Sequence, residues 1–94
     1  MVMKVLVAAA SIALMTAPAA HAEAAFTCEV NTNNVIYHTG PGPDYTRLGQ
    51  VHRGRVLTWR AGEGGTDGHY WIKGDLHGGR AGVWIRGDFL NCSQ

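Results

Sequence analysis

The chain reads Val35-Ile36-Tyr37-His38-Thr39-Gly40-Pro41-Gly42-Pro43-Asp44-Tyr45 in the first half of its 94 residues. The first part alternates, so that Val35 and Tyr37 share one face of an extended strand. The glycines and prolines that follow are typical of turns, because proline presets its φ angle and glycine adopts conformations that other residues avoid. The stretch therefore predicts a short strand that ends in a turn-rich loop.

Segments of the same kind lie on both sides of this stretch, each bounded by turn-forming residues. We expect further strands at residues 26–30, 48–51, 56–60, 70–73, 81–86 and 89–92. Leu57 and Trp59 should share the inward face of their strand, and the glycine-rich residues 61–69 should form a loop. No window has a sustained helical period, and strands at a spacing of about 8 to 12 residues predict an all-β barrel.

The first 22 residues have the parts of a secretory signal peptide. Lys4 precedes an apolar run over residues 5–17, and Ala20-His21-Ala22 matches a cleavage site. The run is shorter than the roughly 20 residues that a membrane-spanning helix needs. We therefore expect a signal peptide at 1–22, no transmembrane anchor, and a secreted protein, extracellular or periplasmic.

The residues after position 22 carry seven Lys and Arg against seven Asp and Glu, so that their formal net charge is zero. Balanced charge argues against nucleic-acid binding, which uses a basic surface. All 13 glycines and all eight aromatic residues lie in this part, a composition typical of short strands and tight turns. We expect a leader and a first strand at 23–34, followed by one small domain at 35–92.

Cys28 and Cys92 are the only cysteines of the chain, and they flank the domain. In an exported protein such a pair predicts a disulfide. A loop of about 65 residues closed in this way stabilises the fold by roughly 4 kcal/mol in the chain-entropy model. The alternative is a metal or redox pair, although no Cys-x-x-Cys motif is present.

Three segments together resemble the bacterial Src-homology-3 domain, a small barrel common in exported and cell-wall-associated proteins. They are residues 35–45 with the Gly-Pro-Gly loop, residues 48–54 with a glycine at the hairpin turn, and residues 83–90 with a Trp strand and an aromatic-Leu end. The resemblance implies an SH3-like barrel of about five to seven short strands, here with one terminal disulfide. It also implies a non-catalytic module that binds a peptide or glycan at the cell envelope.

The residues that catalysis or metal binding would need are scarce or scattered. Ser93 is the one serine after position 22, and both cysteines are expected to be bridged, so a covalent nucleophile is lacking. The carboxylates are scattered through glycine-rich turns, and the histidines form no close-spaced pair at positions 38, 52, 69 and 77. We expect no enzyme, no metal site and no cofactor.

The aromatic residues divide into two groups. Trp59, Trp84 and Phe89 are expected to fill the core of so small a barrel. A second group is expected to line a groove for a peptide or glycan: Tyr37, His38, Tyr45, Tyr70 and Trp71. Exposed aromatic side chains on a rigid barrel provide contact area at low entropic cost. The alternative is that Tyr45 and Trp71 only cover the open ends of the barrel.

Two further motifs have both a functional and a structural interpretation. The basic segment His52, Arg53, Arg55 and Arg60 could meet an anionic wall polymer or a lipid headgroup, or be a solvated hairpin balanced by Glu63 and Asp67. Arg86-Gly87-Asp88 spells an adhesion tripeptide, but it falls where the fold needs a turn.

The sequence thus predicts a secreted, monomeric binding module. Its expected partner is cell-wall peptide or glycan. A small secreted effector or inhibitor that docks on a protein partner through residues 61–69 is the alternative.

Overall fold

The computed structural model describes residues 25–94, and the predicted signal peptide at 1–22 lies outside these residues. The described chain is all-β, as predicted, with seven strands and one short 3₁₀ turn. The elements are β2 (Thr27–Val30), β3 (Val35–His38), β4 (Arg47–Val51), β5 (Val56–Gly64), β6 (Tyr70–Leu76), β7 (Val83–Arg86), η3 (Gly87–Phe89) and β8 (Leu90–Ser93). No helix within residues 25–94 has the length and apolar character needed to cross a membrane.

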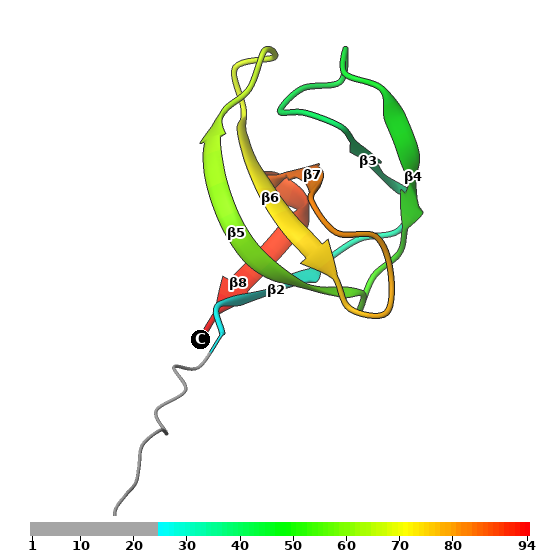
Figure 1. Ribbon diagram of the computed structural model, residues 1–94, viewed down its shortest axis with the longest axis vertical. Helices are drawn as coiled ribbons and strands as arrows, with labels where there is room; N and C mark the ends of the chain where they lie inside the picture. The colour runs from blue at the N-terminus through cyan, green and yellow to red at the C-terminus, as the bar shows by residue number, and fades with distance from the viewer. Residues whose placement is uncertain (1–24) are drawn as a thin grey trace, which may run out of the picture.

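The seven strands form one antiparallel sheet in the order β4-β3-β7-β6-β5-β2-β8. The sheet curls, so that the strands surround a common interior (Figure 1). Because β3 pairs with β7, segments far apart in the sequence lie side by side, and the loops that follow β3 and β5 reach the same end of the sheet.

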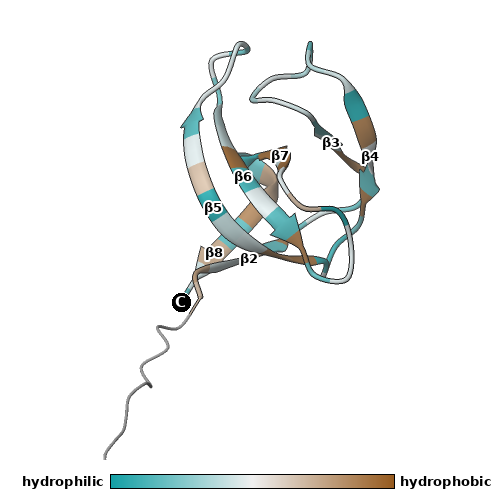
Figure 2. Cartoon of the chain, in the orientation of Figure 1, coloured by the Kyte–Doolittle hydropathy of each residue, from teal (hydrophilic) through white to brown (hydrophobic). Residues whose placement is uncertain are grey.

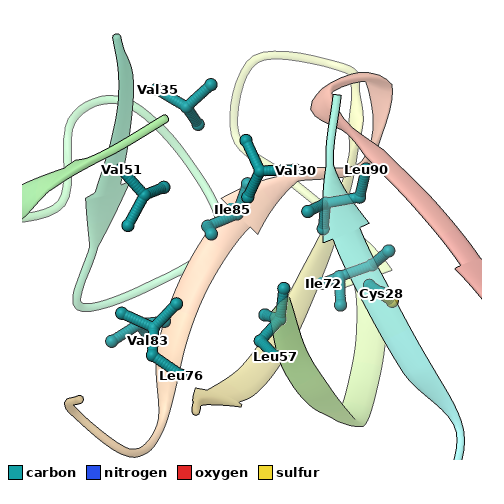
Figure 3. Close-up of a cluster of buried hydrophobic side chains, with 10 residues drawn as sticks. All are labelled: Cys28, Val30, Val35, Val51, Leu57, Ile72, Leu76, Val83, Ile85 and Leu90. Atoms are coloured by element: carbon teal, nitrogen blue, oxygen red, sulfur yellow. The ribbon is translucent and has the colours of Figure 1, made fainter. Parts of the chain in front are cut away.

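One hydrophobic core fills the concave side of the sheet and draws on every strand (Figure 3). Its buried members are Cys28, Val30, Val35, Val51, Leu57, Ile72, Leu76, Val83, Ile85 and Leu90. Leu57 is fully buried and Trp59 packs against this cluster, as predicted for the inward face of β5. Burying one such aliphatic side chain stabilises a fold by about 1.5 to 3 kcal/mol, so this cluster is the main source of stability.

A disulfide joins Cys28 of β2 to Cys92 of β8, as predicted. The two residues lie directly opposite each other in the β2–β8 register. The bond therefore fastens the edge strand β8 and the end of the chain to the inner part of the sheet.

The predicted loop at 61–69 is wrong in its first half, because β5 continues to Gly64. Residues 61–64 pair with β6, with Gly62 opposite Ile72 and Gly64 opposite Tyr70. The register shifts between Trp59 and Ala61, so that a bulge bends the long hairpin there. A Cβ atom at Gly62 would overlap the Tyr70 hydroxyl, so glycine at this position lets the ring lie across the strand.

Trp84 does not join the core, contrary to the sequence-based expectation, whereas Trp59 and Phe89 pack against it. Its neighbours Val83 and Ile85 are fully buried on the inner face of β7. Since successive side chains of a strand point to opposite sides, Trp84 stands on the outer face, where it is half-buried. Most strands carry hydrophobic and hydrophilic residues together, as expected for a sheet with one buried face (Figure 2).

Candidate functional site

The loop after β3, residues 39–46, is fastened to the tip of the β5–β6 hairpin, residues 65–69. The backbone N–H of Thr66 donates to the carbonyl of Pro41 over 3.0 Å, and the Thr66 hydroxyl donates to Asp44. A Cβ atom at Gly42 would overlap the Thr66 hydroxyl, so the close approach of the two loops needs glycine there. The two loops therefore form one rigid surface at this end of the sheet.

Trp71 lies beneath this surface and is only 4% exposed. Its Nε1–H donates to Asp67 Oδ1 over 2.8 Å, and the His69 backbone N–H donates to the same oxygen over 3.1 Å. A Cβ atom at Gly65 would overlap the indole, so the hairpin tip packs directly on the ring. Trp71 thus positions the hairpin tip and offers almost no free surface to a ligand.

The hydrogen bonds from Trp71 and His69 change the acidity of Asp67. Partial removal from water raises the pKa of this carboxyl, but the hydrogen bonds from Trp71 and the His69 backbone, together with the Asp67 backbone N–H and the electrostatic effect of the His69 side chain, outweigh it and hold the pKa below its usual value. Asp67 is therefore a carboxylate at neutral pH. Its negative charge is stabilised by hydrogen bonds within the hairpin tip.

His38 links Trp71 to the 39–46 loop and is 8% exposed. Its ring meets the Trp71 ring edge-on, with centroids 5.6 Å apart. Its Nδ1 lies 3.0 Å from the carbonyl oxygen of Tyr45. Because a carbonyl oxygen can only accept, Nδ1 carries the proton and donates to Tyr45. The imidazole therefore fixes the backbone of Tyr45.

Tyr45 is the exposed aromatic residue of this group, with 42% of its surface free. A Cβ atom at Gly40 would lie 2.6 Å from Cγ and Cε1 of the ring, so the ring rests on the glycine backbone. With its carbonyl held by His38 and one side of its ring held by Gly40, Tyr45 presents the other side to solvent in a fixed position.

Tyr37 and Tyr70 pack on other glycines. Tyr37 lies across Gly49 of β4, its direct partner in the register, and packs against the core. Tyr70 is 55% exposed, and its ring extends over Gly62 on one side and approaches Gly87 on the other. Of the five predicted residues, the structure links His38, Tyr45 and Trp71 by direct contact.

Trp84, which the sequence alone predicts in the core, also belongs to this surface. It lies directly opposite His38 of β3 and Lys73 of β6 in the register. Side chains of directly opposed residues project from the same face of a sheet. The position of Trp84 between the apolar Val83 and Ile85 is the sequence signal that could have placed it on the face opposite to theirs. We call His38, Tyr45, Trp71 and Trp84 the outer aromatic face: Tyr45 and Trp84 are accessible on it, and the buried His38 and Trp71 lie beneath and support it.

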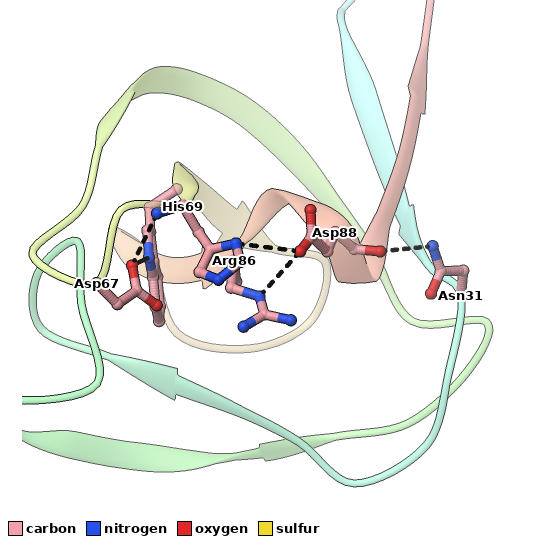
Figure 4. A network of polar contacts seen from close by, with 6 residues as sticks. Asn31, Asp67, His69, Arg86 and Asp88 are labelled. Atoms are coloured by element: carbon pink, nitrogen blue, oxygen red, sulfur yellow. Dashed lines mark hydrogen bonds and ion pairs between the residues drawn. The ribbon is translucent and has the colours of Figure 1, made fainter.

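A polar network closes the other side of the hairpin tip (Figure 4). Asp88 Oδ2 lies 3.4 Å from His69 Nδ1 and 3.2 Å from Arg86 Nε, and the Asp88 carbonyl accepts a hydrogen bond from Asn31. Arg86 Nε is buried and close enough for an ion pair, but it is not aligned for a hydrogen bond. The guanidinium Cζ also lies 4.6 Å from the centre of the Phe89 ring. The two charged side chains of Arg86-Gly87-Asp88 therefore pair with each other across the start of η3.

The remaining histidines lie apart from this network. His52 Nδ1 accepts the backbone N–H of Asn34 over 3.1 Å, and His77 Nε2 lies 3.0 Å from the Thr58 hydroxyl. Residues 25–94 bring together no group of three side chains suited to a metal ion, and they enclose no pocket. Tyr45 and Trp84 are the accessible residues of the outer aromatic face, so a ligand there would be held from one side.

Comparison of the chain with protein-family models, with curated proteins and with solved structures finds no match.

Proposed function

We propose that this protein is an exported, non-catalytic binding module of the bacterial Src-homology-3 type, which recognises cell-wall peptide or glycan through the outer aromatic face. The all-β sheet with its terminal disulfide supports this proposal, because a stapled barrel of this size is a rigid platform for exposed side chains. The resemblance of residues 35–45, 48–54 and 83–90 to the family supports the type of module.

The position of Tyr45 carries the proposal. Its ring is 42% exposed, yet Gly40 supports it and His38 holds its carbonyl. An aromatic ring that is already fixed loses little entropy when a sugar ring or a peptide packs on it. Trp84, opposite His38 on β7, extends the same surface with a second half-exposed ring. Stacking on the fixed Tyr45 ring and the neighbouring Trp84 ring suits the flat faces of a glycan or an extended peptide.

The test is retention of the purified protein on isolated peptidoglycan, with a thermal melt beside each variant. Tyr45→Ala should weaken retention by about 2 kcal/mol or more, as loss of a central aromatic anchor does, at an unchanged melting temperature. Tyr45→Phe, which keeps the ring, should bind nearly as the parent does.

Tyr70→Ala is the matched control, because Tyr70 is an exposed tyrosine on a different support. Its loss should leave retention unchanged. Equal retention of Tyr45→Ala and the parent would refute the proposed surface. Failure of the parent to bind peptidoglycan, with capture of one protein from culture supernatant, would refute the wall ligand in favour of a protein partner.

A further inference from the structure

Two turns that are distant in the sequence meet at the end of the sheet opposite the 39–46 loop and the tip of the β5–β6 hairpin. They are residues 52–55 between β4 and β5, and residues 77–80 after β6 (Figure 1). The His77 backbone N–H donates to the carbonyl of Val56 over 3.0 Å, which places one turn beside the other. A Cβ atom at Gly79 would overlap Arg55 Nη2, so the Arg55 guanidinium lies against the second turn.

The two adjacent turns contain five basic residues and no acidic residue. We call His52, Arg53, Arg55, His77 and Arg80 the basic end. All of them are exposed except Arg55, which is half-buried. None of the three arginines forms an ion pair within residues 25–94, where the pairs involve Arg60, His69 and Arg86.

The nearby carboxylates do not neutralise the basic end. Asp75 binds Arg60 Nε over 2.6 Å and accepts the Gly82 backbone N–H over 2.9 Å, so its charge is already matched. Glu29 faces outward on β2 opposite Val56 and is the one acidic residue on the strand beside Arg55. Three arginines therefore stand against a single unpaired carboxylate.

The other end of the sheet carries the opposite charge. Asp44 and Asp67 lie in the fastened loops, Glu63 lies at the end of β5, and Asp88 lies beside the hairpin tip. Arg47 and Arg86 are the arginines on that side. Residues 23–94 therefore have zero net charge although positive and negative charges lie at opposite ends of the molecule. The attraction of an ion to one end depends on the local electric field there and not on the net charge.

We propose that the basic end binds a linear, phosphate-bearing polyanion without nucleobases, because none of its five residues is a Phe, Tyr or Trp on which a base could stack. The guanidinium group offers a planar pair of donors that matches phosphate oxygens, and three of them on two adjacent turns can contact successive phosphates of one chain. Gly54 and Gly78 leave open space around their Cα atoms, so a polymer can approach the turns closely.

A polymer fits this surface better than a membrane does. Proteins that lie on membranes insert apolar side chains beside their positive charges. The large exposed hydrophobic residues among residues 25–94 are Tyr45 and Tyr70, and both belong to the opposite end of the sheet. The basic end has charge and glycine but no apolar side chain to insert.

The experiment measures binding of linear inorganic polyphosphate to the purified protein by fluorescence anisotropy at about 50 mM and about 150 mM salt. The parent should bind, and the logarithm of the affinity should fall with the logarithm of salt concentration with a slope of about −2 to −3, as expected for three charge contacts. Arg53→Gln and Arg80→Gln should each weaken binding about fivefold, and the double variant about twentyfold.

Arg47→Gln is the control, because it removes the same charge from an exposed position at the other end of the sheet. Its affinity should equal that of the parent. An equal loss with Arg47→Gln, or no binding of the parent at the lower salt concentration, would overturn the proposal.

Two further probes identify the ligand chemistry. Polyglutamate should bind more weakly than polyphosphate, and vesicles of phosphatidylglycerol should bind more weakly than either. Equal or tighter binding of polyglutamate would overturn the phosphate assignment, and preferential binding of the vesicles would overturn the polymer assignment. Tyr45→Ala should bind polyphosphate like the parent, so this result does not depend on the proposed peptidoglycan site.

Discussion

Cys28 and Cys92 face each other across β2 and β8, and their disulfide joins positions 64 residues apart. β8 is an edge strand whose partner within the sheet is β2. The disulfide therefore anchors β8, which lacks the second neighbouring strand that holds each inner strand in place.

Replacement of both cysteines by serine should lower the free energy of unfolding by about 4 kcal/mol, because the unfolded chain loses its largest constraint. Denaturant unfolding of the oxidised protein and the double variant measures this difference. The intact mass of the parent should be lower than the reduced mass by two hydrogens. Two titratable thiols in freshly purified protein would contradict the prediction.

Gly62→Ala should destabilise the fold by about 1 to 3 kcal/mol, because the new methyl group would overlap the Tyr70 ring. Gly64→Ala is the control on the same strand, since a Cβ atom there meets nothing within 4 Å. It should leave stability unchanged or raise it by a few tenths of a kcal/mol. Thermal melts of the two variants measure the difference, and equal effects would mean that Tyr70 does not pack across β5.

Trp71→Ala should cost about 3 to 5 kcal/mol, because it removes a buried ring and the donor to Asp67. Trp84→Ala should cost less, because the ring is half-buried on the outer face and lies outside the core. Denaturant unfolding of both variants tests this order. The reverse order would place Trp84 in the core, as predicted from the sequence.

Asp75 makes stability depend on pH. The Gly82 N–H and then Arg60 lower the pKa of Asp75 in the folded state below its usual value of 3.8. A carboxyl whose pKa is lower in the folded state than in the unfolded state stabilises the fold above the unfolded value and loses this effect as pH falls through the folded value. The stabilisation from Asp75 is thus complete at neutral pH and declines below about pH 4.

Asp75→Asn should therefore lower stability at neutral pH and flatten the loss of stability below about pH 4. Melting temperatures between about pH 2 and pH 7 measure both effects. Glu29→Gln is the control, because Glu29 is exposed and forms no ion pair within residues 25–94. An unaltered pH profile for Asp75→Asn would show that the carboxylate contributes nothing to folding.

Local patterns explain why much of the fold could be predicted. Alternation in Val35-Ile36-Tyr37 and in Val83-Trp84-Ile85, interrupted by glycine, proline and asparagine, marks strands and turns through backbone preferences that act over a few residues. The partners of the disulfide could be predicted without the structure, since two cysteines allow only one pairing. The extension of β5 to Gly64 could not be read in this way, because its glycines become a strand only when β6 pairs with them.

The roles of Trp71 and Trp84 depended on tertiary structure. Both tryptophans follow the same local pattern, but burial depends on which distant segments cover a side chain. The hairpin tip at Gly65 and Asp67 covers Trp71, whereas Trp84 stays half-exposed beside His38. The basic end arose in the same way, since Arg80 joins Arg53 and Arg55 only where two turns meet. Strand and turn propensities are properties of neighbours along the chain, while burial and electrostatic fields are properties of neighbours in space.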